Sequence, residues 1–312
     1  MSELINAFKQ ALLNACENIT VQENVKTSHM TSFKIGGIAP LVIRPETVEQ
    51  MVLCRRVSFE LGIEPLWLGN GTNMLIPDGE LDMVIIKPQG ELRQVSVEGD
   101  TLVAGCAASM ATLARTALDA SLTGLEFAHG IPGTVGGGVY MNAGAYGGCL
   151  ADCTVWSECI SPEGELVKFA ADEHCFAYRH SAFMANGFIV ARTAFKLSEG
   201  KRKDIAALMD ELKTKREQSQ PLDMPSAGST FKRPVNGYAA ALINDAGLKG
   251  LSVGGAMVSK KHSGFVVNTG SATYDDVIAL MRLVQQRVCD AYGVMLSPEV
   301  RILDKEGKEW TF

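Results

Sequence analysis

The chain has 312 residues, more than one typical hydrophobic core accommodates, so we expect two or three domains. Its formal net charge of −6 offers no positive surface to a nucleic-acid backbone, and no basic amphipathic run suggests binding to a membrane surface. These features argue against nucleic acid and membrane as partners.

The first segment, residues 1–20, predicts an amphipathic helix, because Ile5, Phe8 and Leu12 lie on one stripe. It lacks the basic start and the unbroken apolar core of a secretory signal. No stretch of the sequence is as long and as apolar as a membrane span. We therefore expect a soluble, cytoplasmic protein.

A strand–helix–strand pattern follows. Residues 40–44 and 64–68 are typical of strands, and between them a helix begins at a capping box on Thr47 and ends at Gly62. The second strand leads into the loop Gly69-Asn70-Gly71-Thr72-Asn73. The pattern predicts a β-α-β unit that closes on a glycine loop.

Short strands dominate residues 81–195. One helix, residues 109–122, interrupts them, and Gly124 lies just beyond it as a stop signal. The mixture predicts an α+β second domain, with strands at 83–86, 94–98, 101–105, 155–160 and 188–195.

A charged helix, residues 204–219, ends before Pro221 and is typical of a connector. A third domain is expected to begin near Leu222. Its predicted elements are a helix at 238–246, a strand at 264–268 and a long helix from Thr273 to the stop at Gly293.

Eight cysteines are spread along the chain without a CxxC pair, which favours free buried thiols over disulfides. Cys149, Cys153 and Cys159 are close enough in sequence to be considered as metal ligands. However, Cys153 and Cys159 fit alternate positions of a strand at 152–160, so we expect no metal site.

Two glycine-rich segments could approach a phosphate. The loop Gly69–Asn73 can turn its amides inward, but it is no dinucleotide fingerprint because a third glycine would fall at Met74. The second segment, Gly130–Gly147, is denser. Two such loops in adjoining domains could wrap a long diphosphate cofactor, whereas a plain turn and a tight crossover are the alternatives.

Three polar clusters lie far apart in the sequence: Tyr178–Ser181, Gly228–Pro234 and Pro298–Arg301. An arginine, a serine and a glutamate brought together could neutralise and then protonate a carbanion next to a carboxylate. Three unrelated surface residues would give the same spacing, so the pattern alone leaves both interpretations open.

The segment Gly250-Leu251-Ser252-Val253-Gly254 matches the nucleophile elbow of serine hydrolases. A helix is predicted before it where a strand is required. No histidine follows His262, and the acids of that region come after it, so the order serine, acid, histidine is impossible. We reject the hydrolase interpretation.

Seven motifs in a fixed order resemble the UDP-N-acetylenolpyruvoylglucosamine reductase family, whose flavoenzymes complete UDP-N-acetylmuramate for bacterial peptidoglycan. The resemblance covers residues 24–303. Its motifs are Thr31–Gly37, Gly69–Asn73, Gly130–Gly147, Tyr178–Ser181, Gly228–Pro234, Lys260–Phe265 and Pro298–Arg301.

The resemblance implies an α+β fold in which a two-part FAD-binding module, of the type shared by covalent-flavin oxidases and cell-wall reductases, precedes a third α+β domain that binds substrate. The first FAD-binding subdomain would take residues 1–80. The second would take residues 81–220 together with the C-terminal residues 299–312, and the substrate-binding domain residues 221–298.

The same resemblance implies the NADPH-dependent reduction of UDP-N-acetylglucosamine enolpyruvate to UDP-N-acetylmuramate through bound FAD. Ser229 would be the general acid, and Arg179 and Glu299 would hold and stabilise the enol intermediate. Tyr178 and Lys232 would contact the substrate.

The family's flavin-binding positions fall on both glycine segments. Thr72 stands where serine is more usual and Gly138 where alanine is, and both keep a small residue. The first loop has no histidine, so the flavin is expected to bind without a covalent bond. The positions are Gly69, Asn70, Gly71, Thr72, Asn73, Pro132, Thr134, Gly136, Asn142 and Ala143.

The stretch between Ser181 and Gly187 is too short for the tyrosine-bearing lid of one subclass, so the chain resembles the lidless subclass. His262 would lie beside the active cleft, with a solvated surface position as the alternative. The rival functions are an FAD-dependent alcohol or lactone oxidase of the same architecture and a binding-only role for a nucleotide sugar.

Overall fold

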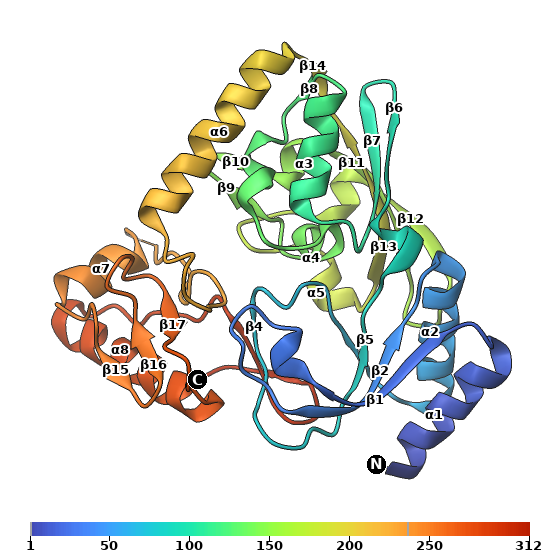
Figure 1. Ribbon diagram of the computed structural model, residues 1–312, viewed down its shortest axis with the longest axis horizontal. Helices are drawn as coiled ribbons and strands as arrows, with labels where there is room; N and C mark the ends of the chain where they lie inside the picture. Colours follow the sequence, from blue (N-terminus) through green and yellow to red (C-terminus); the bar gives the residue numbers. More distant parts are fainter. Residues whose placement is uncertain (1, 236) are drawn as a thin grey trace. The chain divides into compact units, whose positions relative to one another are not determined.

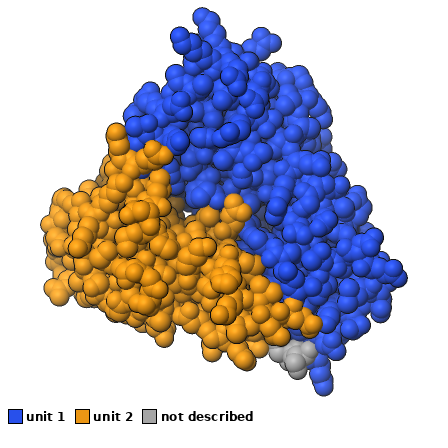
Figure 2. All heavy atoms as spheres, in the orientation of Figure 1, with its two compact units in different colours: residues 1–22, 41–69, 84–216 blue, residues 23–40, 70–83, 217–312 orange. Residues whose placement is uncertain are grey.

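The computed structural model describes residues 2–235 and 237–312. The chain forms two compact units, each built from separate stretches of sequence (Figure 2). Unit 1 contains the chain up to Gln22, Leu41–Gly69 and Val84–Arg216, and unit 2 contains Glu23–Pro40, Asn70–Met83 and Glu217–Phe312. The three-domain division expected from the sequence stays a proposal.

The predicted strand–helix–strand pattern is confirmed in the first sheet (Figure 1). Its elements are β1 (Thr20–Lys26), β2 (Ile38–Arg44), α2 (Val48–Leu61), β3 (Leu66–Trp67) and β5 (Val84–Ile86), preceded by α1 (Ser2–Ala15). The strand order is β1-β2-β5-β3, and β5 is parallel to both β2 and β3. Apolar side chains of both helices and the sheet form one core, which includes Phe8, Leu12, Leu41, Ile43 and Val57.

Local signals determine where α2 begins and ends. The Thr47 hydroxyl accepts the Gln50 amide at 3.2 Å, and Gly62 ends the helix with a φ of 65°. The Gln50 side chain accepts the amide of Glu46 at 2.7 Å, one residue earlier than in a standard capping box.

The second sheet of unit 1 is antiparallel. Its strands are β6 (Val95–Glu98), β7 (Thr101–Gly105), β11 (Thr154–Ile160), β12 (Leu166–Ala170) and β13 (Ile189–Lys196), in the order β12-β11-β13-β7-β6. Four of these strands were predicted, and β12 was not. Its residues are mostly exposed, so the strand depends on pairing with β11 and has no hydrophobic alternation of its own.

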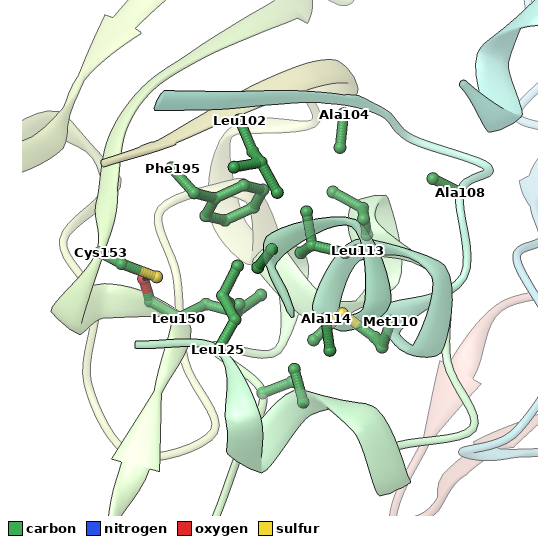
Figure 3. Close-up of a cluster of buried hydrophobic side chains, with 14 of the residues drawn as sticks. Leu102, Ala104, Ala108, Met110, Leu113, Ala114, Leu125, Leu150, Cys153 and Phe195 are labelled. Carbon is green, nitrogen blue, oxygen red and sulfur yellow. Dashed lines mark hydrogen bonds between the residues drawn. The ribbon is translucent and has the colours of Figure 1, made fainter. Parts of the chain in front are cut away.

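Helix α3 (Met110–Asp119) packs its apolar face against this sheet. Figure 3 shows Leu113 of α3 opposite Leu102 of β7 and Phe195 of β13, and all three are fully buried. The Cys153 thiol lies in the same cluster, where burial raises its pKa to about 12. This thiol is therefore a neutral, packed group.

The predicted end of α3 was wrong. Ser109 caps the helix as expected, since its hydroxyl accepts the Thr112 amide, but the helix stops at Asp119. Ser121 then takes a φ of 58°, and buried Leu122 enters the strand β8 (Leu122–Thr123), which pairs with β14 (Ser198–Glu199). Pairing with a distant strand thus ends the helix before Gly124.

Short elements complete unit 1. They are α4 (Val135–Tyr140), β9 (Gly144–Ala145), β10 (Gly148–Cys149), α5 (Phe183–Asn186) and 3-10 turns at Gly90–Arg93, Glu126–Gly130, Leu150–Asp152 and Ala171–His174. The helix predicted at residues 204–219 is α6 (Arg202–Ser219).

The described residues of unit 2, which leave out residue 236, form two small sheets and two α-helices. One sheet has the order β15-β16-β17, from β15 (Ser252–Val253), β16 (Ala256–Val258) and β17 (Val266–Asn268), and the other has the order β19-β18-β4, from β4 (Met74–Leu75), β18 (Arg301–Leu303) and β19 (Glu309–Trp310). The helices are α7 (Ala239–Asp245) and α8 (Tyr274–Tyr292), with a 3-10 turn at Thr27–His29.

Helix α8 has the ends that the sequence predicts. The Thr273 hydroxyl accepts the Asp276 amide at 3.1 Å, the Asp276 carboxylate accepts the Thr273 amide at 3.0 Å, and Gly293 ends the helix with a φ of 67°. Its apolar stripe is fully buried and comprises Val277, Met281, Val284 and Val288.

All eight cysteines are free thiols. Four are buried, namely Cys54, Cys106, Cys153 and Cys159, whereas Cys175 is exposed. Within residues 2–235 and 237–312, no group of three His, Cys, Asp or Glu side chains could hold a metal ion. No helix of these residues is long and apolar enough to cross a membrane.

Candidate functional site

Gly69, the first residue of the first glycine segment, lies next to Thr134 of the second segment, and both residues belong to unit 1. Gly69 follows β3, and a Cβ atom on it would lie 2.5 Å from the Thr134 hydroxyl oxygen, a distance that a real side chain cannot adopt. Thr134 is buried and caps α4, since its hydroxyl accepts the Gly137 amide at 3.4 Å. The close approach of the buried Thr134 side chain to the Gly69 backbone therefore favours glycine at position 69.

A second position of the loop Gly69–Asn73 also requires glycine. Gly71 takes a φ of 59°, and a Cβ atom there would lie 2.4 Å from the Met30 carbonyl oxygen. The Ser32 amide donates to the Gly71 carbonyl at 3.1 Å, and the Ser32 hydroxyl donates to the Ser226 carbonyl at 2.6 Å. Ser32 thus fastens the loop from within the motif Thr31–Gly37.

Several amides at the two segments are available to a ligand. Those of Gly71, Thr72, Gly133 and Thr134 donate to no other group in the part of the chain that the structure describes. Gly71 and Thr134 are buried residues, and buried amides are rarely left unpaired. An acceptor from outside the chain, such as a phosphate oxygen, would satisfy the amides of each segment, those of Gly71 and Thr72 in unit 2 and those of Gly133 and Thr134 in unit 1.

The second glycine segment is partly a helix, which the sequence did not predict. Cβ atoms on Gly136 and Gly138 of α4 would each lie 2.9 Å from a neighbouring atom, the Cys106 Cβ and the Met110 sulfur respectively. A Cβ on Gly137 would have only an ordinary contact with Thr134, at 3.5 Å. Two of the glycines therefore let α4 pack closely on its neighbours.

Arg179 is held in a tight turn. The backbones of Ala177 and His180 exchange two hydrogen bonds of 3.1 Å, which leaves Tyr178 and Arg179 at the tip. Arg179 takes a φ of 53°, a left-handed conformation that costs an arginine about 1–2 kcal/mol. Its guanidinium donates to the Gly144 carbonyl at 3.5 Å and lies 5.6 Å from the Tyr178 ring centroid.

Two side chains fasten this turn to the second glycine segment. Buried Asn142 donates from Nδ2 to the Ala177 carbonyl at 3.1 Å and accepts the Ala151 amide at 3.0 Å. The buried Ser181 hydroxyl donates to the Tyr140 carbonyl at 2.7 Å. These bonds therefore hold Tyr178 and Arg179 next to Asn142. The second glycine segment, to which Asn142 belongs, also contains Ala143, Pro132 and Gly136.

Ser229 and Glu299 lie in neighbouring extended segments of unit 2. The Glu299 amide donates to the Thr230 carbonyl and the Lys232 amide to the Ser297 carbonyl, both at 2.8 Å. On the other side, the Thr230 amide donates to the Gly264 carbonyl at 2.8 Å. Glu299 is 9% exposed, and its carbonyl accepts the Asn73 side-chain amide at 3.2 Å. The structure thus gathers Ser229, Glu299 and Asn73.

His262 is half-buried, which removes the solvated surface position. Its Nδ1 accepts the Gly264 amide at 3.1 Å, and its ring meets the Phe265 ring edge-on at 5.0 Å. Burial, aided by the charge of Lys249, lowers the pKa of His262, so the neutral imidazole is favoured. Its observed role is to shape the turn that pairs with Thr230.

Sequence reasoning missed two residues that fasten the first loop. One is Ser32, and the other is Lys87, whose ammonium donates to the Gly69 carbonyl. Ser32 lies in the motif Thr31–Gly37, for which the sequence indicates no role. The only signal for Lys87 is a lysine directly after the buried strand β5.

Comparison with known proteins identifies both parts of the chain. Residues 39–170 match the model of an FAD binding domain, and residues 220–303 match the C-terminal domain of UDP-N-acetylenolpyruvoylglucosamine reductase. The UDP-N-acetylenolpyruvoylglucosamine reductase of Clostridium novyi is 41% identical over 97% of this chain and 98% of its own length. The Staphylococcus aureus reductase is 39% identical over 98% of both chains.

The crystal structure of UDP-N-acetylenolpyruvylglucosamine reductase from Thermus caldophilus superimposes with a TM-score of 0.80 at 34% identity, covering 91% of this chain and 99% of that one. The FAD-binding fold class expected from the sequence is thereby confirmed. Because relatives of one name align over nearly the whole chain, this protein belongs to the UDP-N-acetylenolpyruvoylglucosamine reductase family.

Proposed function

We propose that this protein reduces UDP-N-acetylglucosamine enolpyruvate to UDP-N-acetylmuramate with electrons from NADPH, through bound FAD, as a step of peptidoglycan precursor synthesis. The observation that carries this proposal is the alignment of reductases with 97–98% of this chain, which spans both the flavin-binding and the substrate-binding parts. A cytoplasmic location is part of the proposal.

The residues present fit FAD. The proposed flavin-binding set keeps Gly69–Asn73 and Thr134, and each of these two segments has unpaired amides that could donate to phosphate oxygens. Pro132, Gly136, Asn142 and Ala143 complete the proposed set. No histidine lies in the first loop, so we expect a non-covalent flavin. When bound, FAD would supply the hydride transfer that links NADPH to the substrate.

Arg179 is proposed to bind the substrate carboxylate and the charge that develops beside it. A guanidinium can bridge two oxygens of one carboxylate, which an ammonium cannot do. The turn around Arg179 is already fastened by Asn142 and Ser181, so little ordering is needed when substrate binds. The adjacent Tyr178 is 57% exposed and available for contact with substrate.

Ser229 is proposed to donate the proton to the carbon next to the carboxylate, and Glu299 to stabilise the enol intermediate. A serine hydroxyl is a weak acid, so its effect depends on position. Backbone hydrogen bonds on both sides of Thr230 fix the segment that carries Ser229. Lys232, which is exposed, is proposed to contact the substrate.

Similarity to reductases over almost the full chain favours this function over an FAD-dependent alcohol or lactone oxidase and over a binding-only role. The test uses the purified protein saturated with FAD and kept anaerobic. NADPH should bleach the flavin, and the enolpyruvyl sugar nucleotide should restore its colour with formation of one UDP-N-acetylmuramate per flavin, measured by mass spectrometry.

Other results of the same test identify the rivals. Failure of NADPH to bleach the flavin would favour binding without catalysis. Reduction by an alcohol or lactone, with re-oxidation by oxygen alone, would favour the oxidase. Acid precipitation should release the flavin into solution, and colour retained by the denatured chain would contradict non-covalent binding.

A further inference from the structure

The carboxyl ends of three parallel strands meet at one edge of the first sheet. Ile43 of β2 pairs with Ile86 of β5, and Ile86 pairs in turn with Trp67 of β3. Arg44, Lys87 and Gly69 therefore come together just beyond these pairs, all within unit 1. In open sheets of this kind, ligands bind outside the carboxyl ends of the strands.

Lys87 is fastened at this edge by both its backbone and its side chain. Its amide donates to the Ile43 carbonyl at 2.8 Å, and its ammonium donates to the Gly69 carbonyl. Gly69 is also the residue whose backbone touches Thr134. The Lys87 ammonium thus binds the residue of the first glycine segment that lies against Thr134 of the second.

Two arginines, Arg44 and Arg93, act electrostatically on Lys87. Burial, with added repulsion from Arg44 and Arg93, lowers the pKa of Lys87 to about 8. Burial and Arg93 lower the pKa of Arg44 as well. Among the described residues, none of these three cations forms an ion pair with an acid. An anion at this edge would relieve the repulsion.

We propose that Lys87 is a positioning residue of the FAD site, which fixes the carbonyl of Gly69 and places positive charge at the residue where the first glycine loop begins. In a planar trans peptide group the N–H points opposite to the carbonyl oxygen, so a hydrogen bond that holds the Gly69 carbonyl also sets the direction of the first amide of the loop that follows. This inference rests on the proposed function, since it takes the anion to be the diphosphate of FAD.

The test measures FAD binding to the apoprotein by quenching of flavin fluorescence, and thermal unfolding of the same apoprotein without FAD. Three variants are compared with the parent: Lys87→Met, Lys87→Arg and the control Lys203→Met, which removes an exposed lysine of α6 in the same unit. None of these readouts depends on turnover.

We expect Lys87→Met to raise the Kd for FAD by about 10- to 100-fold, the usual value of a hydrogen bond to a charged group. Its apoprotein should unfold at the parent's temperature or higher, because the repulsion from Arg44 and Arg93 is removed. Lys87→Arg should retain most of the affinity, and Lys203→Met all of it.

Two results would overturn the inference. The first is parental FAD affinity in Lys87→Met. The second is weak binding by both Lys87 variants together with an equally lowered unfolding temperature, which would make Lys87 a support of the fold. A parent protein that binds no FAD would instead contradict the proposed function.

Discussion

Arg179 and Ser229 are held in place by different kinds of interaction. The turn that carries Arg179 depends on side chains, since Asn142 and Ser181 bind it to the second glycine segment while Arg179 keeps a left-handed φ of 53°. The segment that carries Ser229 depends on backbone hydrogen bonds to residues on both sides of Thr230. Substitution of distant side chains should therefore disturb Arg179 far more than Ser229.

The largest effect is expected from Ser229→Ala, because the change removes the proposed proton donor and leaves its backbone bonds intact. Re-oxidation of reduced flavin by the enolpyruvyl substrate should slow by about 10² to 10⁴, the usual value of a positioned general acid. Bleaching by NADPH should stay near the parent rate. Stopped-flow absorbance measures both steps.

A matched control is Ser252→Ala, an exposed serine in the same unit that belongs to the rejected hydrolase motif. It should leave both steps unchanged. If Ser229→Ala slows both steps equally, Ser229 shapes the site; if it slows neither, another group or water delivers the proton.

Arg179→Lys should be next in size. It keeps the positive charge but loses the planar guanidinium that can bridge two carboxylate oxygens. We expect kcat/KM for the sugar nucleotide to fall by about 10- to 100-fold, the cost of one charge-assisted hydrogen bond. Steady-state kinetics under saturating NADPH measures it.

The control for this change is Arg192→Lys, in an exposed ion pair with Glu158, which should have little effect. Parental turnover in Arg179→Lys would show that charge alone suffices and would remove the reason for the strained turn.

Gly136→Ala tests the support beneath the Arg179 turn. The new Cβ would lie 2.9 Å from the Cys106 Cβ, so α4 must move. Helix α4 ends at Tyr140, whose carbonyl accepts the Ser181 hydroxyl, so this movement would reach the turn. We expect a loss of about 1–3 kcal/mol in the free energy of unfolding, typical of an overpacked core. Urea denaturation of the apoprotein measures it.

Gly137→Ala is the matched control one residue along the same helix. Its Cβ has only an ordinary contact, so the variant should be as stable as the parent or gain about 0.4–1 kcal/mol from a less flexible unfolded chain. Equal losses in the two variants would mean that the glycines serve helix conformation and not close packing.

The smallest effect should be a pH dependence of FAD binding that is due to Lys87. Like Asn142 and Ser181, Lys87 holds a backbone carbonyl in place with its side chain. Its pKa of about 8 in the protein lies below the usual value of about 10.4, and a bound diphosphate would raise it again. Below pH 8 the lysine is charged before and after binding. Above pH 8, binding must take up a proton, so affinity should fall by up to about 10-fold per pH unit.

This pH dependence should be weaker in Lys87→Met, because the variant has no titrating lysine at this position. The stability of the apoprotein should change with pH in the direction opposite to the affinity for FAD. The unfolded chain holds the Lys87 proton up to about pH 10.4 while the folded chain releases it near pH 8, so the Lys87 contribution to stability rises across that window. An identical pH profile in parent and variant would contradict both statements.

Local signals in the sequence were reliable wherever neighbours along the chain decide the structure. Thr47 and Gly62 bound α2, and Thr273 and Gly293 bound α8, because a cap and its amide lie within three residues of each other. The motifs around Arg179, Ser229 and Glu299 likewise sufficed to indicate the family. Their roles in one reaction stay a proposal.

Contacts between distant residues decided the rest. The glycine run predicted as a loop contains α4, since Gly136 and Gly138 pack against Cys106 and Met110 and no local rule reports such packing. Helix α3 stops at Asp119 because Leu122 pairs with Glu199, a residue far along the chain. The sequence by itself determined the strand–helix–strand order, the helix caps and the family. Only the tertiary structure placed Asn142 beneath Arg179 and Lys87 against Gly69, because hydrogen bonds between residues far apart in the chain leave no periodic pattern in it.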